Sequence, residues 1–248
     1  AFLENSFEIK NWALEPIEGG DALSALKRVA DRINIKDQIR ITSVSGKGTL
    51  IRYVDMPRMS IEDIRKSFVY EADKYFPFDP QTIYTDCCIL DPLSKEKKVS
   101  VLVVAAKKEL VDDRMKLFKD AGIDLNYVTT NSIATANAFE KLFKSQAPNG
   151  ARAILDIGGS VSNLMILDKN NSPCFTRDIY VGSQEMSKQI SNNLGVDLAK
   201  AEELKLNPGN RISEIMVACE EAIENLNGEV HLSFDYFMTE RNTPVSEL

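Results

Sequence analysis

Residues 153–167 read AILDIGGSVSNLMIL. An apolar strand ends at Asp156, two glycines and two serines follow, and a second apolar strand starts at once. This pattern is typical of a β-hairpin that holds a polyphosphate and its metal, because glycine lets backbone amides approach oxygen atoms closely. An ordinary tight hairpin has the same pattern, so the stretch by itself leaves both interpretations open.

The polar groups of this hairpin suit two kinds of contact. The hydroxyls of Ser160 and Ser162 can donate hydrogen bonds to phosphate oxygens. Asp156 can hold a water molecule bound to Mg²⁺, because this ion keeps most of its waters and takes few carboxylates. We therefore expect a metal contact at Asp156 that passes through water.

Composition and charge limit the classes of partner. The chain has 248 residues, enough for one large or two small domains, with 44% hydrophobic and 27% charged residues, as in a soluble globular protein. Its net charge of −7 argues against nucleic acid and against an anionic membrane surface. No apolar run approaches the ~20 residues of a membrane helix. We expect no nucleic-acid partner and no direct membrane insertion.

Familiar catalytic and metal-binding patterns do not occur. His231 is the only histidine, which argues against a histidine-based metal site and a Ser-His-Asp triad. The four cysteines form no C-x-x-C pair, and we expect them to be reduced. Residues 46–49 (GKGT) do not fit a P-loop, and G-x-G-x-x-G is absent. The sequence therefore predicts no catalytic residue.

The hydrophobic periodicity predicts alternating helices and strands. Between Met59 and Val128 the expected order is helix, strand, strand, helix, strand, which indicates a small α/β unit with its own sheet. Met56-Pro57 is expected to end a strand, since proline cannot continue a strand interior. Residues 148–150 (PNG) read as a linker. The expected strands are 7–14, 39–44, 50–54, 82–90, 99–105, 125–128, the two of the hairpin, and 174–181; the expected helices are 21–33, 60–76, 107–120, 133–143, one from Gly182, 198–206 and 212–237.

Seven stretches in this order and spacing carry a resemblance to a known family. The most specific is the E-A-x-x-Y-x-P-F element of residues 71–78. With it the chain resembles the PilM family of type IV pilus assembly proteins, which are actin-like and related to the division protein FtsA. The resemblance covers nearly the whole chain. The seven stretches are 56–59, 71–78, 101–106, 121–123, 155–158, 177–179 and 201–205.

The resemblance implies an α/β, actin-like (RNase H-like) fold of two lobes with a nucleotide cleft between them. The first lobe would comprise residues 1–57 and 128–148, and a small inserted α/β subdomain would span 58–127. The second lobe would be 150–248. Against the family pattern, the chain starts after the first phosphate loop and stops before the adenosine loop.

The resemblance also implies bound ATP and Mg²⁺, with at most a weak ATPase activity. The hairpin would be the second phosphate loop, Gly182 would start a helix that faces the phosphates, and a Glu-Lys pair would reach the ribose and base. The residues implied are Asp156, Gly158, Gly159, Ser160, Ser162, Gly182, Glu202 and Lys205, with Asp156 also holding the metal through water.

The implied partner is the N-terminal cytoplasmic peptide of a PilN-like inner-membrane protein. It would lie in a groove between the inserted subdomain and the first lobe, with Tyr75, Phe76 and Phe78 as candidate anchors. Plain core packing is the alternative explanation of these aromatics. The protein would then be cytoplasmic, in a bacterium, and held at the inner membrane through partners. Self-association is a further expectation.

Three alternatives stay open from the sequence. One is a cytoplasmic GspL-like component of type II secretion without nucleotide. Another is a kinase or phosphohydrolase of the same superfamily, which ATP turnover would reveal. The third is a polymer-forming protein, which light scattering with and without nucleotide would reveal.

Overall fold

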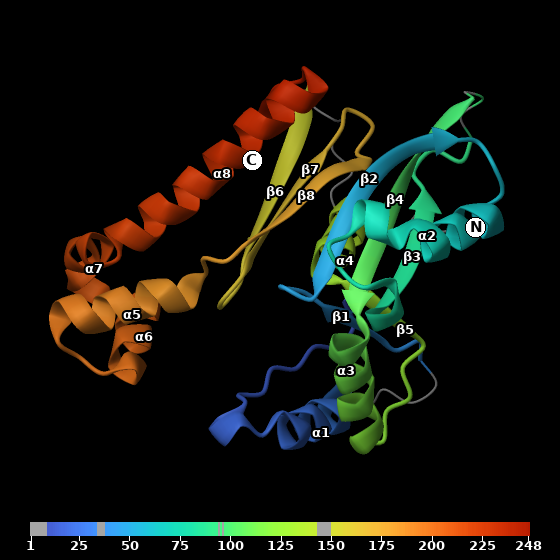
Figure 1. Cartoon of the computed structure of the whole chain (residues 1–248). Helices are drawn as coiled ribbons and strands as arrows, with labels where there is room; N and C mark the ends of the chain where they lie inside the picture. The colour runs from blue at the N-terminus through green and yellow to red at the C-terminus, as the bar shows by residue number, and fades with distance from the viewer. Residues whose placement is uncertain (1–8, 34–37, 94, 96, 143–149) are drawn as a thin grey trace, which may run out of the picture. The chain divides into compact units, whose positions relative to one another are not determined.

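The computed structural model describes residues 9–33, 38–93, 95, 97–142 and 150–248. The chain divides into two compact units, Ala1–Lys144 and Ser145–Leu248, and both are mixed α/β (Figure 1). The strand expected at 7–14 does not form over residues 9–14, and residues 7 and 8 lie outside the described part of the chain.

Unit 1 contains a three-stranded antiparallel sheet covered by one helix. Strands β2 (Thr49–Pro57), β3 (Ile83–Ile89) and β4 (Lys98–Lys107) have the order β2-β4-β3. Helix α2 (Ile61–Tyr75) begins at Ser60, whose Oγ accepts a hydrogen bond from the Asp63 amide at 3.1 Å, which confirms the predicted cap. Its apolar face packs on β4, with Ile64, Phe68, Ala72, Val101 and Val103 all buried in one core.

The start of the small sheet differs from the prediction. The strand expected over 50–54 is longer: β2 ends at Pro57, paired with Lys98, so the Met56-Pro57 pair forms the end of the strand rather than lying beyond it. A proline is tolerated at this position because its missing N–H falls at the end of the ladder. Since β2 pairs with β4, we place the start of the small α/β unit at Thr49 rather than at residue 58.

The rest of unit 1 surrounds a short parallel pair of strands. Strand β1 (Ile41–Val44) lies beside β5 (Tyr127–Thr130). The Asp21 carboxylate accepts a hydrogen bond from the Ser24 amide at 3.0 Å at the start of α1, as predicted. The other elements are η1 (Glu18–Gly20), α1 (Ala22–Ile33), η2 (Pro80–Thr82), α3 (Lys108–Asp120) and α4 (Asn131–Leu142).

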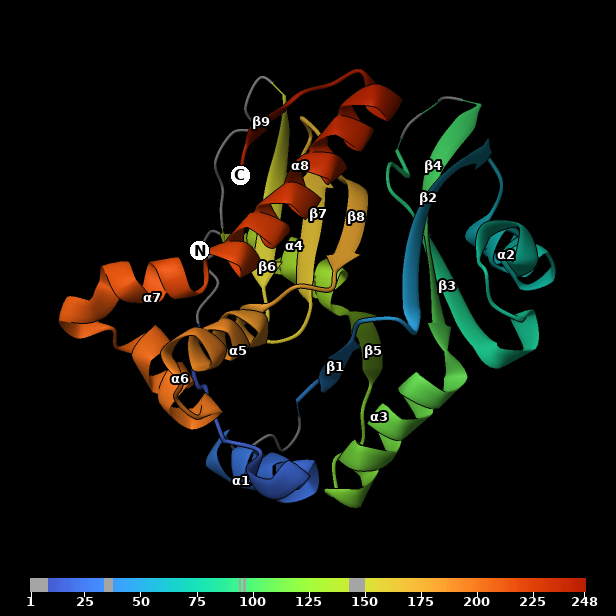
Figure 2. The ribbon, with the colours of Figure 1, turned by 60° about the vertical axis from the view of Figure 1, so that its left-hand side comes forward.

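Unit 2 is built on a four-stranded sheet of order β8-β7-β6-β9. Its strands are β6 (Ala151–Ile157), β7 (Ser162–Leu167), β8 (Pro173–Ile179) and β9 (Val245–Glu247), and β9 runs parallel to β6 (Figure 2). The predicted hairpin is β6–β7, closed by the pair Ile157 and Ser162. The helices are α5 (Ser183–Leu194), α6 (Leu198–Leu206), η3 (Gly209–Arg211), α7 (Ile212–Ala218) and α8 (Glu220–Arg241).

The single long helix expected over 212–237 is wrong, because α7 and α8 separate at Cys219, where φ is −114° and ψ is 13°. The two helices serve different cores. Ile215 of α7 packs with Ile190 and Ala201 of α5 and α6, whereas Leu226 of α8 packs on the sheet. One straight helix cannot face both cores, so the apolar periodicity continues across a real break.

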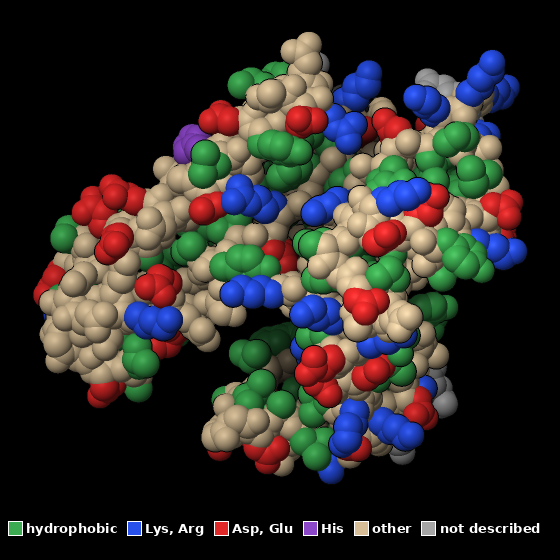
Figure 3. All heavy atoms as spheres, in the orientation of Figure 1, with side chains coloured by type: hydrophobic (Ala, Val, Ile, Leu, Met, Phe, Trp, Pro, Cys, Tyr) green, Lys and Arg blue, Asp and Glu red, His purple; other side chains and the backbone are tan. Residues whose placement is uncertain are grey.

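The surface carries side chains of both charges. Acidic and basic side chains are interspersed on the face shown in Figure 3. Within the described residues, no helix combines the length and apolar character that a membrane crossing requires. His231 lies exposed on α8, and the four cysteines are free thiols.

Candidate functional site

The loop of the β6–β7 hairpin is residues 158–161, which we call the glycine turn. A Cβ on Gly158 would lie 2.5 Å from the Val161 carbonyl oxygen, so this position excludes every other residue without a shift of the backbone. Gly159 is less restricted, because its nearest contact is the Gln184 side chain at 3.5 Å. Within the turn, only Gly158 must therefore be glycine for steric reasons.

The glycine turn is bonded to the first turn of α5. The amide of Ser183 donates to the Gly158 carbonyl at 2.9 Å, and the amide of Gln184 donates to the Gly159 carbonyl at 2.8 Å. Gly182 begins α5, as predicted. We expected the first amides of this helix to face phosphate. The amides of Ser183 and Gln184 instead donate to carbonyls of the glycine turn, so the expectation is corrected for these two amides.

The exposed groups of the turn remain available to a ligand. Asp156 is exposed near the end of β6, and its carboxylate forms no hydrogen bond or ion pair within the described part of the chain. Ser160 is exposed, and the amides of Gly159 and Ser160 likewise bind no described residue. A carboxylate beside unused amides fits a phosphate with its hydrated metal.

Ser162 has a different role from the predicted one. It is fully buried, and its hydroxyl donates to the Val181 carbonyl at 2.6 Å. Its single hydroxyl proton therefore joins β7 to the segment before α5, and we correct the expectation that it donates to phosphate.

The ammonium group of Lys205 makes three hydrogen bonds within the protein. Its Nζ donates to the Ser183 carbonyl at 3.0 Å, to the Ser187 hydroxyl at 2.9 Å and to Glu202 Oε2 at 2.7 Å. An ammonium has three protons, so all are used, and the predicted contact of Lys205 with ribose or base is corrected. This residue instead joins α6 to the first turn of α5.

Glu202 keeps one oxygen for other contacts. Its Oε2 accepts from Lys205 and also from the Ser187 hydroxyl at 2.5 Å, and these two hydrogen bonds lower the pKa of the carboxyl group, Lys205 most. The side chain is 46% exposed, and its Oε1 accepts no hydrogen bond from a described residue. Glu202 is therefore a charged acceptor held in one orientation.

Two further polar residues escaped the sequence reasoning. Asn163 is directly opposite Asp156 on the neighbouring strand, and Asp178 is directly opposite Asn163 on the next. Asn163 is buried, and its Nδ2 donates to Asp178 Oδ1 at 2.6 Å. The signal was present in the sequence, because a four-residue turn pairs residue 156 with residue 163.

The predicted aromatic anchors lie in or around the core of the small sheet. Phe76 is only 3% exposed and belongs to that core, so we correct its assignment to an open groove. Tyr75 is half-buried and packs edge-on against Phe68 with ring centroids 5.0 Å apart. Phe78 is half-buried below the Lys107 ammonium, which is 5.7 Å from the ring centroid.

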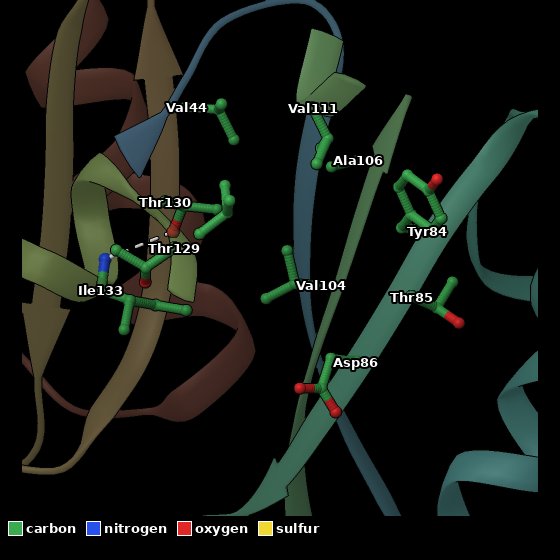
Figure 4. A pocket seen from close by; sticks show the side chains of 11 residues that line it. Val44, Tyr84, Thr85, Asp86, Val104, Ala106, Val111, Thr129, Thr130 and Ile133 are labelled. Carbon is green, nitrogen blue, oxygen red and sulfur yellow. Dashed lines mark hydrogen bonds between the residues drawn. The ribbon is translucent and has the colours of Figure 1, made fainter. Parts of the chain in front are cut away.

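A cavity of about 220 Å³ opens elsewhere in unit 1, between the small sheet and the β1–β5 pair (Figure 4). Within it the Ile133 amide donates to the Thr130 hydroxyl at 3.4 Å. Most of the wall is apolar, and Tyr84, Thr85 and Asp86 of the edge strand β3 form one side. The remaining lining residues are Val44, Val104, Ala106, Val111, Val128 and Thr129.

Known proteins of one family are similar to this chain in both sequence and fold. A family model described as type IV pilus assembly protein PilM matches residues 11–245. The solved structure of a PilM-PilN type IV pilus biogenesis complex is 21% identical with a TM-score of 0.78, over 94% of this chain and 69% of that chain. This similarity confirms the expected fold class. None of the curated proteins matches.

Two more distant structures show weaker similarity. The ethanolamine utilization protein EutJ from Carboxydothermus hydrogenoformans is 20% identical with a TM-score of 0.41, over 54% of this chain and 45% of that one. The cytoplasmic domain of EpsL, an inner membrane component of the type II secretion system of Vibrio cholerae, is 14% identical with a TM-score of 0.41, over 68% and 60%. The family match extends over nearly the whole sequence, and the chain therefore belongs to the PilM family of type IV pilus assembly proteins.

Proposed function

We propose that this chain is a scaffold of type IV pilus assembly that binds magnesium-ATP at the glycine turn and an extended peptide of an inner-membrane partner in unit 1. The nucleotide part rests on one observation above all. An exposed carboxylate, Asp156, has no partner among the described residues and precedes the glycine turn, in which the amides of Gly159 and Ser160 bind no described residue.

Each residue of the proposed nucleotide site has a defined task. Asp156 accepts hydrogen bonds from water on Mg²⁺, and Gly159 and Ser160 donate to phosphate oxygens. Glu202 accepts a hydrogen bond from a ribose hydroxyl through Oε1, in the orientation that Lys205 gives it. Magnesium, when bound, neutralises phosphate charge. Binding of this kind holds a conformation without requiring hydrolysis.

Isothermal titration with ATP and Mg²⁺ tests the nucleotide part. Asp156→Ala removes the carboxylate that accepts from the waters of Mg²⁺, and Ser160→Ala removes the hydroxyl that donates to phosphate but keeps the backbone amide. Each should weaken binding about tenfold, because a hydrogen bond to a charged group is worth roughly 1.5–3 kcal/mol. Ser162→Ala is the matched control: it removes a buried hydroxyl and about 1 kcal/mol of stability, but leaves the affinity unchanged. An unmodified chain that binds no ATP, or an Asp156→Ala variant with full affinity, contradicts the proposal.

The peptide part rests on the 220 Å³ cavity beside an edge strand. Strand β3 has β4 as its one neighbour among the described strands, so an extended peptide can add to it and insert apolar side chains into the cavity. The similar PilM structure is itself a complex with PilN, which supports a PilN-like partner.

Fluorescence anisotropy with labelled N-terminal peptides of inner-membrane pilus components tests this part. Ile133→Lys places a charge in the cavity and should weaken binding at least about tenfold. Ala134→Lys changes an exposed neighbour on the same helix and should have no effect. Equal affinities for the two variants would exclude the cavity as the peptide site. Peptide binding without ATP binding would favour a GspL-like component, and sustained ATP turnover on an acceptor would favour a kinase.

A further inference from the structure

Three polar side chains form one row across the sheet of unit 2. Asp156 on β6 is opposite Asn163 on β7, which is opposite Asp178 on β8. Directly opposite residues of antiparallel strands share a face of the sheet, with Cβ atoms ~4.5–5.5 Å apart. The row therefore places an amide between two carboxylates, and the carboxylate at one end is the one that the proposed function assigns to the metal.

The middle residue has a fixed orientation. Asn163 is 4% exposed, and its Nδ2 donates to Asp178 Oδ1 at 2.6 Å. A carboxylate only accepts hydrogen bonds, so Asp178 binds the NH₂ end of the amide and never the oxygen. Because oxygen and nitrogen lie on different sides of the planar amide, Asn163 Oδ1 is directed away from Asp178. This oxygen accepts no hydrogen bond from a residue that the structure describes.

We infer that Asp178 positions Asn163 so that Asn163 Oδ1, together with Asp156, accepts hydrogen bonds from the waters of Mg²⁺. The inference rests on the proposed function. Asn163 is then a contact residue of the hydrated ion, and Asp178 is a positioning residue that acts through it. An amide suits the middle of the row because it supplies an oxygen without a third negative charge beside two carboxylates.

The test exploits the difference between an amide and a carboxylate. In Asp178→Asn the new amide can accept from or donate to Asn163, so the Asn163 amide is free to turn and present NH₂ to the waters. A double variant combines Asn163→Asp with Asp178→Asn. Its new amide at position 178 donates to the new carboxylate at position 163, whose second oxygen is directed toward the ion. The double variant has the same total charge as the unmodified chain.

The measurement is a titration with Mn²⁺, followed by electron paramagnetic resonance, at a saturating concentration of a nonhydrolysable ATP analogue. Asp178→Asn should weaken Mn²⁺ binding about tenfold or more, as is usual when the partner of a metal contact is lost. The double variant should recover to within about threefold of the unmodified chain. If Asp178 had a merely structural role, the double variant would not recover Mn²⁺ affinity, because it carries the same substitution at position 178 and a second one at position 163.

The outcomes separate this inference from the proposed function. If Mn²⁺ affinity is the same in the unmodified chain and in Asp156→Ala, the proposed metal site is wrong. If Asp156→Ala loses affinity while Asp178→Asn keeps it, or the double variant fails to recover, only the inference is overturned. Should Asp178→Asn not fold, as judged by circular dichroism, Asn163→Ala removes the oxygen directly: about tenfold weaker binding supports its contact, and unchanged binding overturns it.

Discussion

A Cβ on Gly182 would lie 2.5 Å from the carbonyl oxygen of Gly159. That oxygen also accepts the amide hydrogen of Gln184 at 2.8 Å. The close approach of two backbones therefore joins the glycine turn to α5. It fixes the turn beside Asp156, and a rigid support of this kind is what a binding site of backbone amides requires.

We expect Gly182→Ala to lower the free energy of unfolding by about 2–4 kcal/mol, because the methyl group meets two backbone carbonyls that cannot move as a flexible side chain does. Urea denaturation followed by circular dichroism measures this change. ATP binding should weaken as well, since the turn and α5 must separate.

Gly228→Ala is the control for this substitution. Gly228 is exposed within α8, and a Cβ there meets no atom within 4 Å. Alanine is the better helix former, so stability should rise by about 1 kcal/mol. A loss of similar size at both glycines would contradict the argument from close approach.

The ammonium of Lys205 makes a second prediction possible. Lys205→Met should cost about 1–3 kcal/mol of stability, because it removes three hydrogen bonds, to Ser183, Ser187 and Glu202, made by a lysine side chain that is only 15% exposed. Lys200→Met, on the same helix, removes a pair with Glu203 in which both side chains are well exposed, and should change stability by less than about 0.5 kcal/mol. Chemical denaturation of both variants decides the matter, and equal effects would refute it.

Stability should also depend on pH through Glu202. The hydrogen bonds from Lys205 and Ser187 lower its pKa in the folded state below the ordinary value of 4.5. The stabilisation is therefore complete above pH 4.5 and is lost as the pH falls through the folded-state pKa. Glu202→Gln should show a smaller loss of stability between neutral pH and that range. Denaturation curves that fall in parallel for both proteins would argue against this linkage.

The aromatic element of residues 75–78 gives a fourth prediction. Phe76→Ala should destabilise the protein by about 3–5 kcal/mol, since a buried ring is lost from the core of the small sheet. Phe78→Ala, at a half-buried ring, should cost less. Thermal unfolding followed by circular dichroism compares the two. A Phe76→Ala variant that keeps its stability but loses peptide binding would restore this residue as an anchor.

Local patterns predicted most of the fold. The cap at Ser60, the helix starting after Gly182 and the β6–β7 hairpin follow from residue types a few positions apart, and all three are confirmed. The break at Cys219 was not predictable in this way. The apolar period continues through it, and only the presence of two separate cores makes a single helix unfavourable.

The candidate site divides in the same manner. The sequence determined the glycine turn, because Gly158 and Asp156 act through their own backbone and charge at fixed spacing. Tertiary structure alone decided which hydroxyl and which cation are available to a ligand. The Ser162 hydroxyl already donates to the Val181 carbonyl, and the Lys205 ammonium already donates to the Ser183 carbonyl on α5. A hydrogen-bond donor has few protons, and neighbours that are distant in sequence determine whether any is left for a ligand.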